Sequence, residues 1–131
     1  MSAVADIAGV HHLNFVVGSL DDHVGALEAA LGVSAIVEAL PARGARTARL
    51  PLGTSWLVLV EPTRPDGVPG RFLERHGEGF FLLSVGVCNF DEAAAALAAG
   101  SAERRGLDGW RIADLTTSLP GGGVLQIAET P

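Results

Sequence analysis

The chain repeats one pattern, a strand followed by a helix, and this repeat limits its possible folds more than any other feature. Strands are predicted over residues 12–17 and 82–87, and each is followed by a polar turn and an Ala/Leu-rich run. Both runs end at a glycine, Gly32 and Gly100, where a left-handed helix stop is expected. Self-similarity of this kind indicates two copies of one supersecondary unit.

Each predicted helix also begins with a capping pattern. The two patterns are Ser19-x-x-Asp22 and Asn89-x-x-Glu92. In such a pattern a side-chain oxygen accepts a free backbone N–H of the first turn, and the acid complements the helix dipole. We therefore expect both helices to be capped in the same way.

Three further strands are predicted after each helix. They cover 34–38, 47–50 and 56–62 in the first copy, and 102–105, 112–118 and 124–129 in the second. The chain thus reads βαβββ twice, an α+β fold of tandem modules within a single domain, 1–131. The first module is assigned to 9–62 and the second to 80–130. A Pro/Gly-rich linker, 63–79, lies between them and carries a short helix at 71–76.

Composition excludes several classes of function. The 131 residues are 48% hydrophobic, and the single cysteine allows neither an internal disulfide nor a Cys-based zinc cluster. The net charge is −6 and all 9 basic residues are arginine, so binding to nucleic acid is not expected. No apolar run is long enough to span a membrane, and no signal peptide is recognisable, so we expect a cytoplasmic protein.

The tandem βαβββ pattern resembles the vicinal oxygen chelate superfamily, which includes glyoxalases, bleomycin-binding proteins and methylmalonyl-CoA epimerase. The stretches most similar to the epimerase and glyoxalase-like branch are Gly44–Thr47, Pro51–Gly53, Val58–Pro62 and Arg71–Gly79. The resemblance implies a cupped mixed sheet around a ligand, and it implies homodimers. It leaves open whether a cup forms within one chain or across the dimer.

The resemblance also implies four metal-ligand positions, which fall on His12, Val58, Leu82 and Gln126. Only His12 and Gln126 carry donor atoms, whereas a tight divalent site generally needs three or more protein ligands. We therefore expect a degenerate site with no metal and no other cofactor. The proton-shuttling glutamate of the family falls on Ala42, with Glu38 a weaker match, which argues against an epimerase.

Strand alternation predicts which side chains line the cup. The predicted lining consists of Val10, His12, Asn14, Trp56, Val58, Val60, Phe80, Leu82, Ser84, Val124, Gln126 and Ala128. It is mostly apolar and suits a hydrophobic or aromatic small molecule held at a few polar points. From it we select His12 as the candidate catalytic residue. The candidate ligand-binding residues are Asn14, Trp56, Val58, Phe80, Leu82, Ser84 and Gln126.

The same residues also have structural interpretations. His12 and Gln126 can be hydrogen-bonded wall residues, Trp56 can belong to the core, and His11 has the opposite strand parity. Trp110 can stack on a ligand or lie at the surface. Arg43, Arg46 and Arg49 are expected at a solvated strand edge.

Three functions follow from this pattern. The first is sequestration of a hydrophobic molecule without chemistry. The second is a metal-independent isomerase, cyclase or lyase that uses His12 as general acid and base. The third, which the donor set favours least, is a metal enzyme whose site is rebuilt with Glu38, Glu61 or Glu129.

Overall fold

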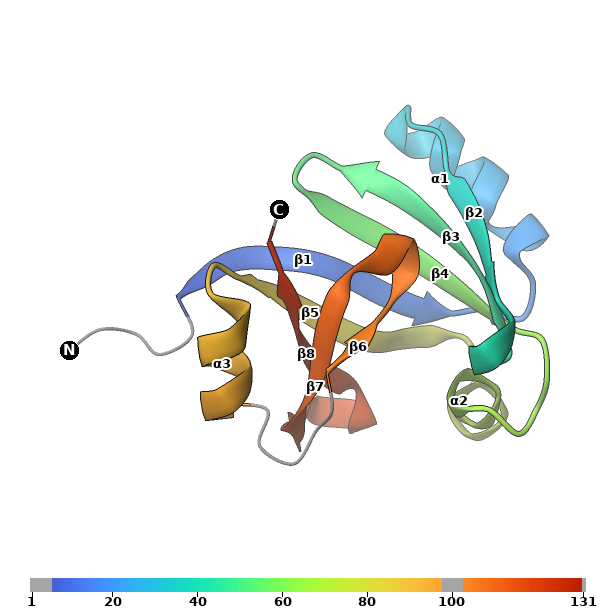
Figure 1. Ribbon diagram of the computed structural model, residues 1–131. Coiled ribbons are helices and arrows are strands. Elements are labelled where there is room, and N and C mark those ends of the chain that lie inside the picture. Colours follow the sequence, from blue (N-terminus) through green and yellow to red (C-terminus); the bar gives the residue numbers. More distant parts are fainter. Residues whose placement is uncertain (1–5, 98–102, 131) are drawn as a thin grey trace. The chain divides into compact units, whose positions relative to one another are not determined.

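The computed structural model describes residues 6–97 and 103–130 (Figure 1). Its strands are β1 (Ile7–Val16), β2 (Ile36–Leu40), β3 (Ala45–Leu52), β4 (Ser55–Pro62), β5 (Gly79–Val87), β6 (Arg104–Arg105), β7 (Arg111–Ser118) and β8 (Val124–Glu129). Its α-helices are α1 (Val24–Leu31), α2 (Val68–His76) and α3 (Phe90–Leu97). The chain divides into two compact units, Leu13–Phe81 and Met1–His12 with Leu82–Pro131. We call them the first-repeat unit and the second-repeat unit.

In the first-repeat unit, β2, β3 and β4 form an antiparallel ladder in that order, with β1 beside β4. The α1 helix packs on one face of this ladder through the partly buried Val24 and Leu27, which lie against a buried cluster of Val17, Leu20, Ala48 and Leu59. Burial of these apolar side chains stabilises the helix, which at 8 residues is too short to persist alone.

In the second-repeat unit the strand order is β5-β8-β7-β6. β5 and β8 run parallel, whereas β8, β7 and β6 are antiparallel neighbours. The α3 helix packs on one face through Phe90 and Ala93, which contact Val87, Ala113 and Ile127. The sheet is therefore mixed, as the predicted α+β fold of tandem βαβββ modules requires.

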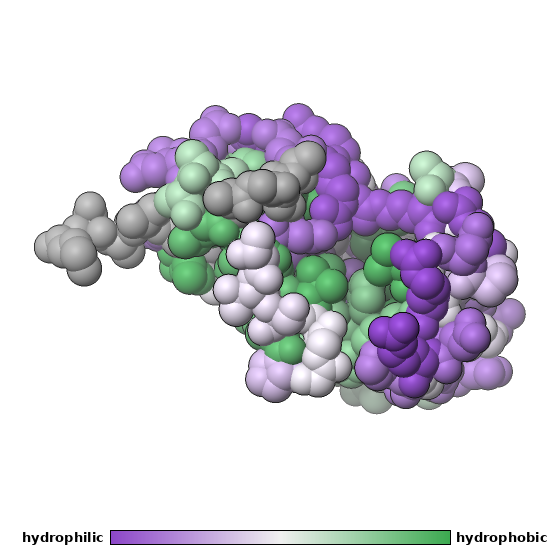
Figure 2. Space-filling model, turned by 90° about the horizontal axis from the view of Figure 1, so that it is seen from below, coloured by the Kyte–Doolittle hydropathy of each residue, from purple (hydrophilic) through white to green (hydrophobic). Residues whose placement is uncertain are grey.

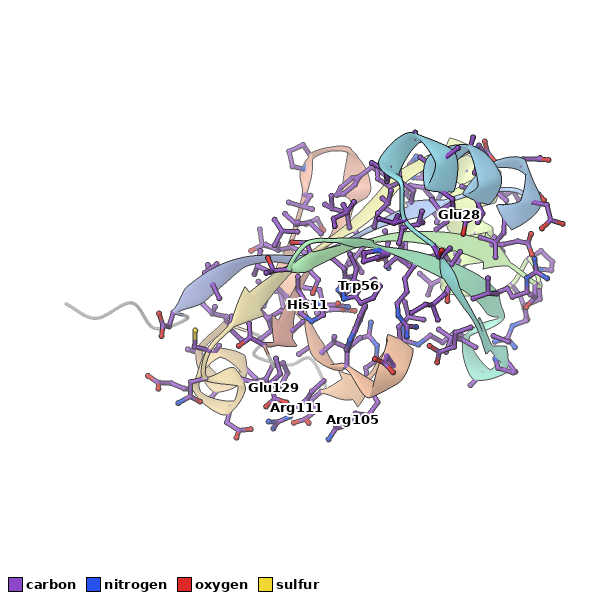
Figure 3. The ribbon with its side chains drawn as sticks, turned by 90° about the horizontal axis from the view of Figure 1, so that it is seen from above. His11, Glu28, Trp56, Arg105, Arg111 and Glu129 are labelled. Atoms are coloured by element: carbon purple, nitrogen blue, oxygen red, sulfur yellow. The ribbon has the colours of Figure 1, made fainter. Side chains whose placement is uncertain are left out.

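An ion-pair network ties α3 to the strands of this unit. Arg111 of β7 donates hydrogen bonds to Asp91 of α3, to Glu103 and, at 3.3 Å, to Glu129 of β8. Figure 3 shows Arg111 and Glu129 next to each other. The guanidinium also lies 4.5 Å from the ring centre of Phe90. Arg111 thus links the helix to two adjacent strands.

The predicted caps behave differently in the two repeats. Asn89 Oδ1 accepts the backbone N–H of Glu92 at 3.2 Å, so the second cap is confirmed. The first prediction is wrong, because Ser19 makes no side-chain cap and a 3₁₀ turn, η1 (Leu20–Asp22), precedes α1. The N–H of Leu20, the first residue of this turn, is accepted by Glu61 of β4 at 2.9 Å.

Other predicted boundaries shift by a few residues. Gly32 ends α1 in the left-handed conformation with φ of 68°, whereas the predicted stop at Gly100 lies outside the described residues. The strand predicted over 34–38 is β2, displaced to Ile36–Leu40, and β6, with two residues, lies within the strand predicted over 102–105. The linker helix is α2, which begins earlier than predicted, with a proline in its first turn.

The surface carries some apolar side chains. Ile36 and Val37 of β2 and Val68 of α2 are exposed. Figure 2 shows hydrophobic residues gathered between hydrophilic ones on one side of the molecule. Exposed apolar residues of this kind are normal for folded proteins, and we attach no function to them. In the part of the chain that the structure describes, every helix is too short or too polar to cross a membrane.

Candidate functional site

The candidate site lies on a sheet face that carries no residue of the helix-packed clusters. In the second-repeat unit, Ala113 and Ile127 face α3, and strand alternation therefore puts Asp114 and Gln126 on the opposite face. We call it the α3-distal face. Ser84 is the parallel-ladder partner of Gln126 and lies on it too.

Polar side chains form a ladder across this face. Gln126 donates from Nε2 to Asp114 Oδ1 at 2.9 Å. Arg104 of β6 holds the same carboxylate through both of its oxygens, with Nη2 3.1 Å from Oδ1 and Nη1 3.1 Å from Oδ2. A forked guanidinium–carboxylate pair of this kind fixes the orientation of Asp114.

Two atoms of this ladder have no hydrogen-bond partner among the described residues. They are Ser84 Oγ and Gln126 Oε1. Their side chains are closed off, since Ser84 is 0% exposed and Gln126 1% exposed. An unmatched buried polar atom costs about 1–3 kcal/mol, so such atoms are normally matched by a bound molecule or by water. These two atoms mark the best candidate binding site.

A second cluster in the same unit is aromatic. His11 Nδ1 and His12 Nδ1 of β1 lie 2.8 Å apart, a hydrogen bond in which one ring donates to the other. The indole of Trp110 is stacked on His12, with ring centres 4.8 Å apart, and stands edge-on to His11 at 4.7 Å. Strand parity alone assigned His11 to the other face, but Trp110 contacts both rings. Figure 3 shows His11 on its strand.

Burial determines the charge of the histidine pair. His12 is 3% exposed, and desolvation, helped by the neighbouring His11, lowers its pKa to about 3. Burial also lowers the pKa of His11. At neutral pH His12 is therefore uncharged and only weakly basic. Proton transfer is most efficient when the catalytic pKa lies near the working pH, so His12 is a poor general acid and base here.

The residues at the four family metal positions do not fit a divalent ion. Val58 and Leu82 offer only alkyl groups, so only His12 and Gln126 carry donor atoms. Gln126 contributes a neutral amide whose nitrogen already donates to Asp114. Among the described residues, no three His, Cys, Asp or Glu side chains form a cluster that can hold a metal.

The acids suggested for a rebuilt metal site have other partners. Glu61 accepts the Leu20 N–H, and Glu129 accepts a hydrogen bond from Arg111. Glu38 pairs with Arg49 at 3.0 Å. These carboxylates are therefore engaged in hydrogen bonds and ion pairs that hold the fold together.

The face opposite α1 in the first-repeat unit is built differently. Arg49 of β3 is buried and pairs with Glu38 of β2, which corrects its predicted place at a solvated edge. Its guanidinium lies 5.4 Å from the ring centre of Trp56 on β4. Val58, the ladder partner of Arg49, is fully buried. This face combines a cation, an aromatic ring and alkyl groups.

The other predicted ligand-binding residues occupy different environments. Asn14 Oδ1 is buried with no partner in the described part of the chain, and Leu82 is buried. Phe80 is 37% exposed and stands edge-on to Phe15, at 5.9 Å between ring centres. Because Phe15 packs against the α1 cluster, Phe80 lies with the helix-side residues and not with Val58.

Ala42, the position at which the resemblance led us to expect the family's glutamate, lies in a well-defined turn. Ala42 lies in the 3₁₀ turn η2 (Pro41–Arg43), and Gly44 follows with a left-handed φ of 63°. A Cβ on Gly44 would come within 2.6 Å of the Arg64 side chain, which itself donates to the carbonyl oxygens of Pro41 and Ala42. The turn is therefore well built, but it carries a methyl group and no base.

A separate apolar pocket of about 320 Å³ lies on the α1 side of the first-repeat unit. Phe15, Leu27 and Leu57 are among its walls, and His23 and Glu78 are also among its lining residues. These two pair at 3.1 Å, and the Gly18 N–H and His23 lower the pKa of Glu78. None of the lining residues has a buried polar atom without a partner. The pocket therefore offers shape but no unmatched hydrogen-bonding group.

The fold defined by these elements is that of the vicinal oxygen chelate superfamily, as the resemblance in the sequence predicted. Solved structures with this fold match the chain closely in three dimensions. Methylmalonyl-CoA epimerase from Mycobacterium tuberculosis superposes with a TM-score of 0.81 at 24% identity, covering 100% of this chain and 93% of that one. A variant of the Streptomyces coelicolor epimerase, in complex with 2-nitronate-propionyl-CoA, gives 0.81 at 27% identity, over 95% and 98% of the two chains.

A selenomethionine methylmalonyl-CoA epimerase also gives a TM-score of 0.81, at only 16% identity and over 100% and 99% of the two chains. No family model matches the sequence. No curated protein matches it either. The chain is thus similar in structure to methylmalonyl-CoA epimerases, and their names alone do not assign its activity.

Proposed function

We propose that the chain binds and sequesters an uncharged, largely apolar small molecule on the α3-distal face, without a divalent metal. The observation that carries this proposal is the pair of buried, unpartnered atoms Ser84 Oγ and Gln126 Oε1. Leu82, Ile112 and Ala128 surround them with apolar surface from neighbouring strands. A few placed polar atoms in an apolar setting are typical of small-molecule sites.

The residues at the family's expected catalytic and metal positions favour binding over turnover. The uncharged His12, with its pKa of about 3, is poorly suited to shuttling a proton near pH 7. Ala42 stands where the family carries a glutamate, and Val58 and Leu82 stand where it carries metal ligands. The homodimer stays a prediction from the resemblance.

The similar solved structures support a second candidate, turnover of an acyl-CoA thioester. One of them is described as methylmalonyl-CoA epimerase in complex with methylmalonyl-CoA and NH4+, at 27% identity. An epimerase must remove and return the proton next to the thioester carbonyl. The described residues offer no evident base for that step, so we place this candidate second.

Titration of ¹⁵N-labelled protein with aromatic alcohols, with and without EDTA, tests the first proposal. We expect saturable shifts at the Ser84 backbone and the Gln126 side-chain amide that EDTA does not change. A parallel assay follows exchange of the C2 hydrogen of methylmalonyl-CoA in D₂O, for which we expect the uncatalysed rate. Exchange that depends on added metal would contradict the proposal, and exchange that His12→Asn abolishes would restore His12 as a catalytic residue.

A further inference from the structure

We propose that Asp114, held by Arg104, orients the Gln126 amide so that the site selects a hydrogen-bond donor, such as a hydroxyl or N–H group, on the bound molecule. This inference rests on the proposed function and names the ligand chemistry that the site accepts. It makes Asp114 a positioning residue, because it acts on the ligand through Gln126.

Asp114 determines which end of the Gln126 amide faces it. The carboxylate, paired with the Arg104 guanidinium, only accepts hydrogen bonds. Its Oδ1 accepts a hydrogen bond from Nε2 of Gln126 at 2.9 Å and another from Nη2 of Arg104 at 3.1 Å. If the amide were turned over, two oxygens would face each other. The carboxylate therefore keeps the nitrogen of Gln126 on its own side.

The position of the amide oxygen follows from the geometry of an amide. With Nε2 directed to Asp114, Oε1 points away from it, and this oxygen is the buried atom without a partner. An amide oxygen only accepts hydrogen bonds. The group that matches it must therefore be a donor.

Ser84, the ladder partner of Gln126, adds a hydroxyl group. A serine hydroxyl can donate or accept, because its O–H rotates to suit the neighbour. A hydroxyl on the ligand can donate to Gln126 Oε1 and accept from Ser84 Oγ. An ether or ketone can use Ser84 alone, and a carboxylate would face the Gln126 oxygen and the charge of Asp114. The site therefore favours alcohols, phenols or N–H compounds over their alkylated forms.

The other repeat has no such device. The position equivalent to Gln126 is Val58, and the ladder partner of Val58 is Arg49, whereas that of Gln126 is Asp114. The donor selection is thus a property of the second-repeat unit.

The test compares two probes, 2-naphthol and its methyl ether, 2-methoxynaphthalene, by calorimetry or NMR titration. Wild-type protein should bind 2-naphthol about tenfold more tightly or better, since a site built to hydrogen-bond a donor rejects the analogue that lacks it. Asp114→Asn should reduce or reverse the preference, because its new amide can donate to Oε1 and release the Gln126 amide to turn over. Gln126→Met removes the acceptor and should abolish the preference.

Two controls separate this effect from size and from charge. The ether is larger than the alcohol, so a preference that persists in Gln126→Met would come from size and would overturn the inference. Asp22→Asn changes the same charge at an exposed position and should keep the wild-type preference. Circular dichroism and the melting temperature confirm that each variant is folded.

The outcomes distinguish the inference from the proposed function. Equal binding of both probes to the wild type would overturn donor selection and leave binding in place. A full preference in Asp114→Asn would overturn the role of Asp114. Binding of neither probe would overturn the inference together with the proposed site.

Discussion

The two repeats carry the same ladder positions with opposite charge. In the first-repeat unit, Glu38 on the edge strand pairs with Arg49 on the next strand at 3.0 Å. In the second-repeat unit the equivalent positions hold Arg104 and Asp114, which pair at 3.1 Å. The equivalence follows from the ladders and from the repeat, since Arg49 lies opposite Val58 and Asp114 opposite Gln126.

The reversal changes what each face can bind. A cation beside Val58 and Trp56 leaves an alkyl and aromatic wall in the first repeat. An anion beside Gln126 instead orients an amide and leaves its oxygen unmatched. A duplicated fold can thus keep its backbone pairing while the side chains at one ladder position differ in charge and in hydrogen bonding.

Exchanging the residues at one equivalent position gives the largest expected effect. Val58→Gln places an amide at a fully buried alkyl site and should lower the free energy of unfolding by about 3 kcal/mol. Gln126→Val removes an unmatched oxygen and should change stability by less than about 1 kcal/mol. Urea unfolding monitored by circular dichroism measures both. Similar losses in the two variants would contradict the asymmetry between the repeats.

The histidine pair makes stability depend on pH. The folded-state pKa of His12 is about 3, well below 6.5, so the unfolded chain takes up the proton first as the pH falls. Stability is therefore fully present above about pH 6.5 and is lost progressively toward pH 3, by about 2 kcal/mol at pH 5. His12→Asn should flatten this dependence between pH 7 and 5. An unchanged slope in that variant would assign the acid sensitivity to other groups.

The Arg49–Glu38 and Arg104–Asp114 ion pairs differ in the burial of the arginine, so we expect a smaller difference in stability between variants of the two pairs. The Arg49 side chain is 7% exposed, whereas those of Arg104 and Asp114 are 37% and 35% exposed. Glu38→Gln should therefore cost about 2 kcal/mol, because it weakens the pairing of a buried guanidinium. Asp114→Asn should cost below about 1 kcal/mol, since solvent screens that pair. Thermal unfolding at low and high salt compares them, and the reverse order would show that burial does not govern these pairs.

The smallest expected difference in stability between the two repeats comes from the helix caps. Asn89→Ala removes a cap that accepts the Glu92 N–H and should cost about 1 kcal/mol. Ser19→Ala should be neutral, because the Ser19 side chain makes no cap hydrogen bond to its turn. Equal losses in the two variants would indicate that Ser19 caps its turn in solution.

The sequence predicts the fold because the repeat and the apolar alternation are local signals. They identify the βαβββ order and the polar positions His12, Ser84 and Gln126 without any knowledge of pairing. The Asn89 cap is equally local. Ser19 makes no such bond, and the turn after it is instead tied through the Leu20 N–H to Glu61, a carboxylate from a strand that is distant in sequence.

The rest of the candidate site depends on contacts that no local pattern reveals. Asp114 lies in a strand whose ladder with β8 is irregular between Asp114 and Ser118, so alternation alone does not place it. Its pairing with Arg104 requires the register of a two-residue strand. His11 has the opposite strand parity, and only its hydrogen bond to His12 and the contact of Trp110 with both rings show that it joins this cluster.

The most direct test of the account is the metal dependence of the purified protein, measured as metal content together with a Co²⁺ or Zn²⁺ titration followed by the melting temperature. The account predicts far less than one equivalent of bound metal, no stabilisation by added ions, and 2-naphthol binding that EDTA leaves unchanged. One tightly bound equivalent with a clear rise in melting temperature would contradict it and would return metal-dependent epimerase or glyoxalase chemistry to first place.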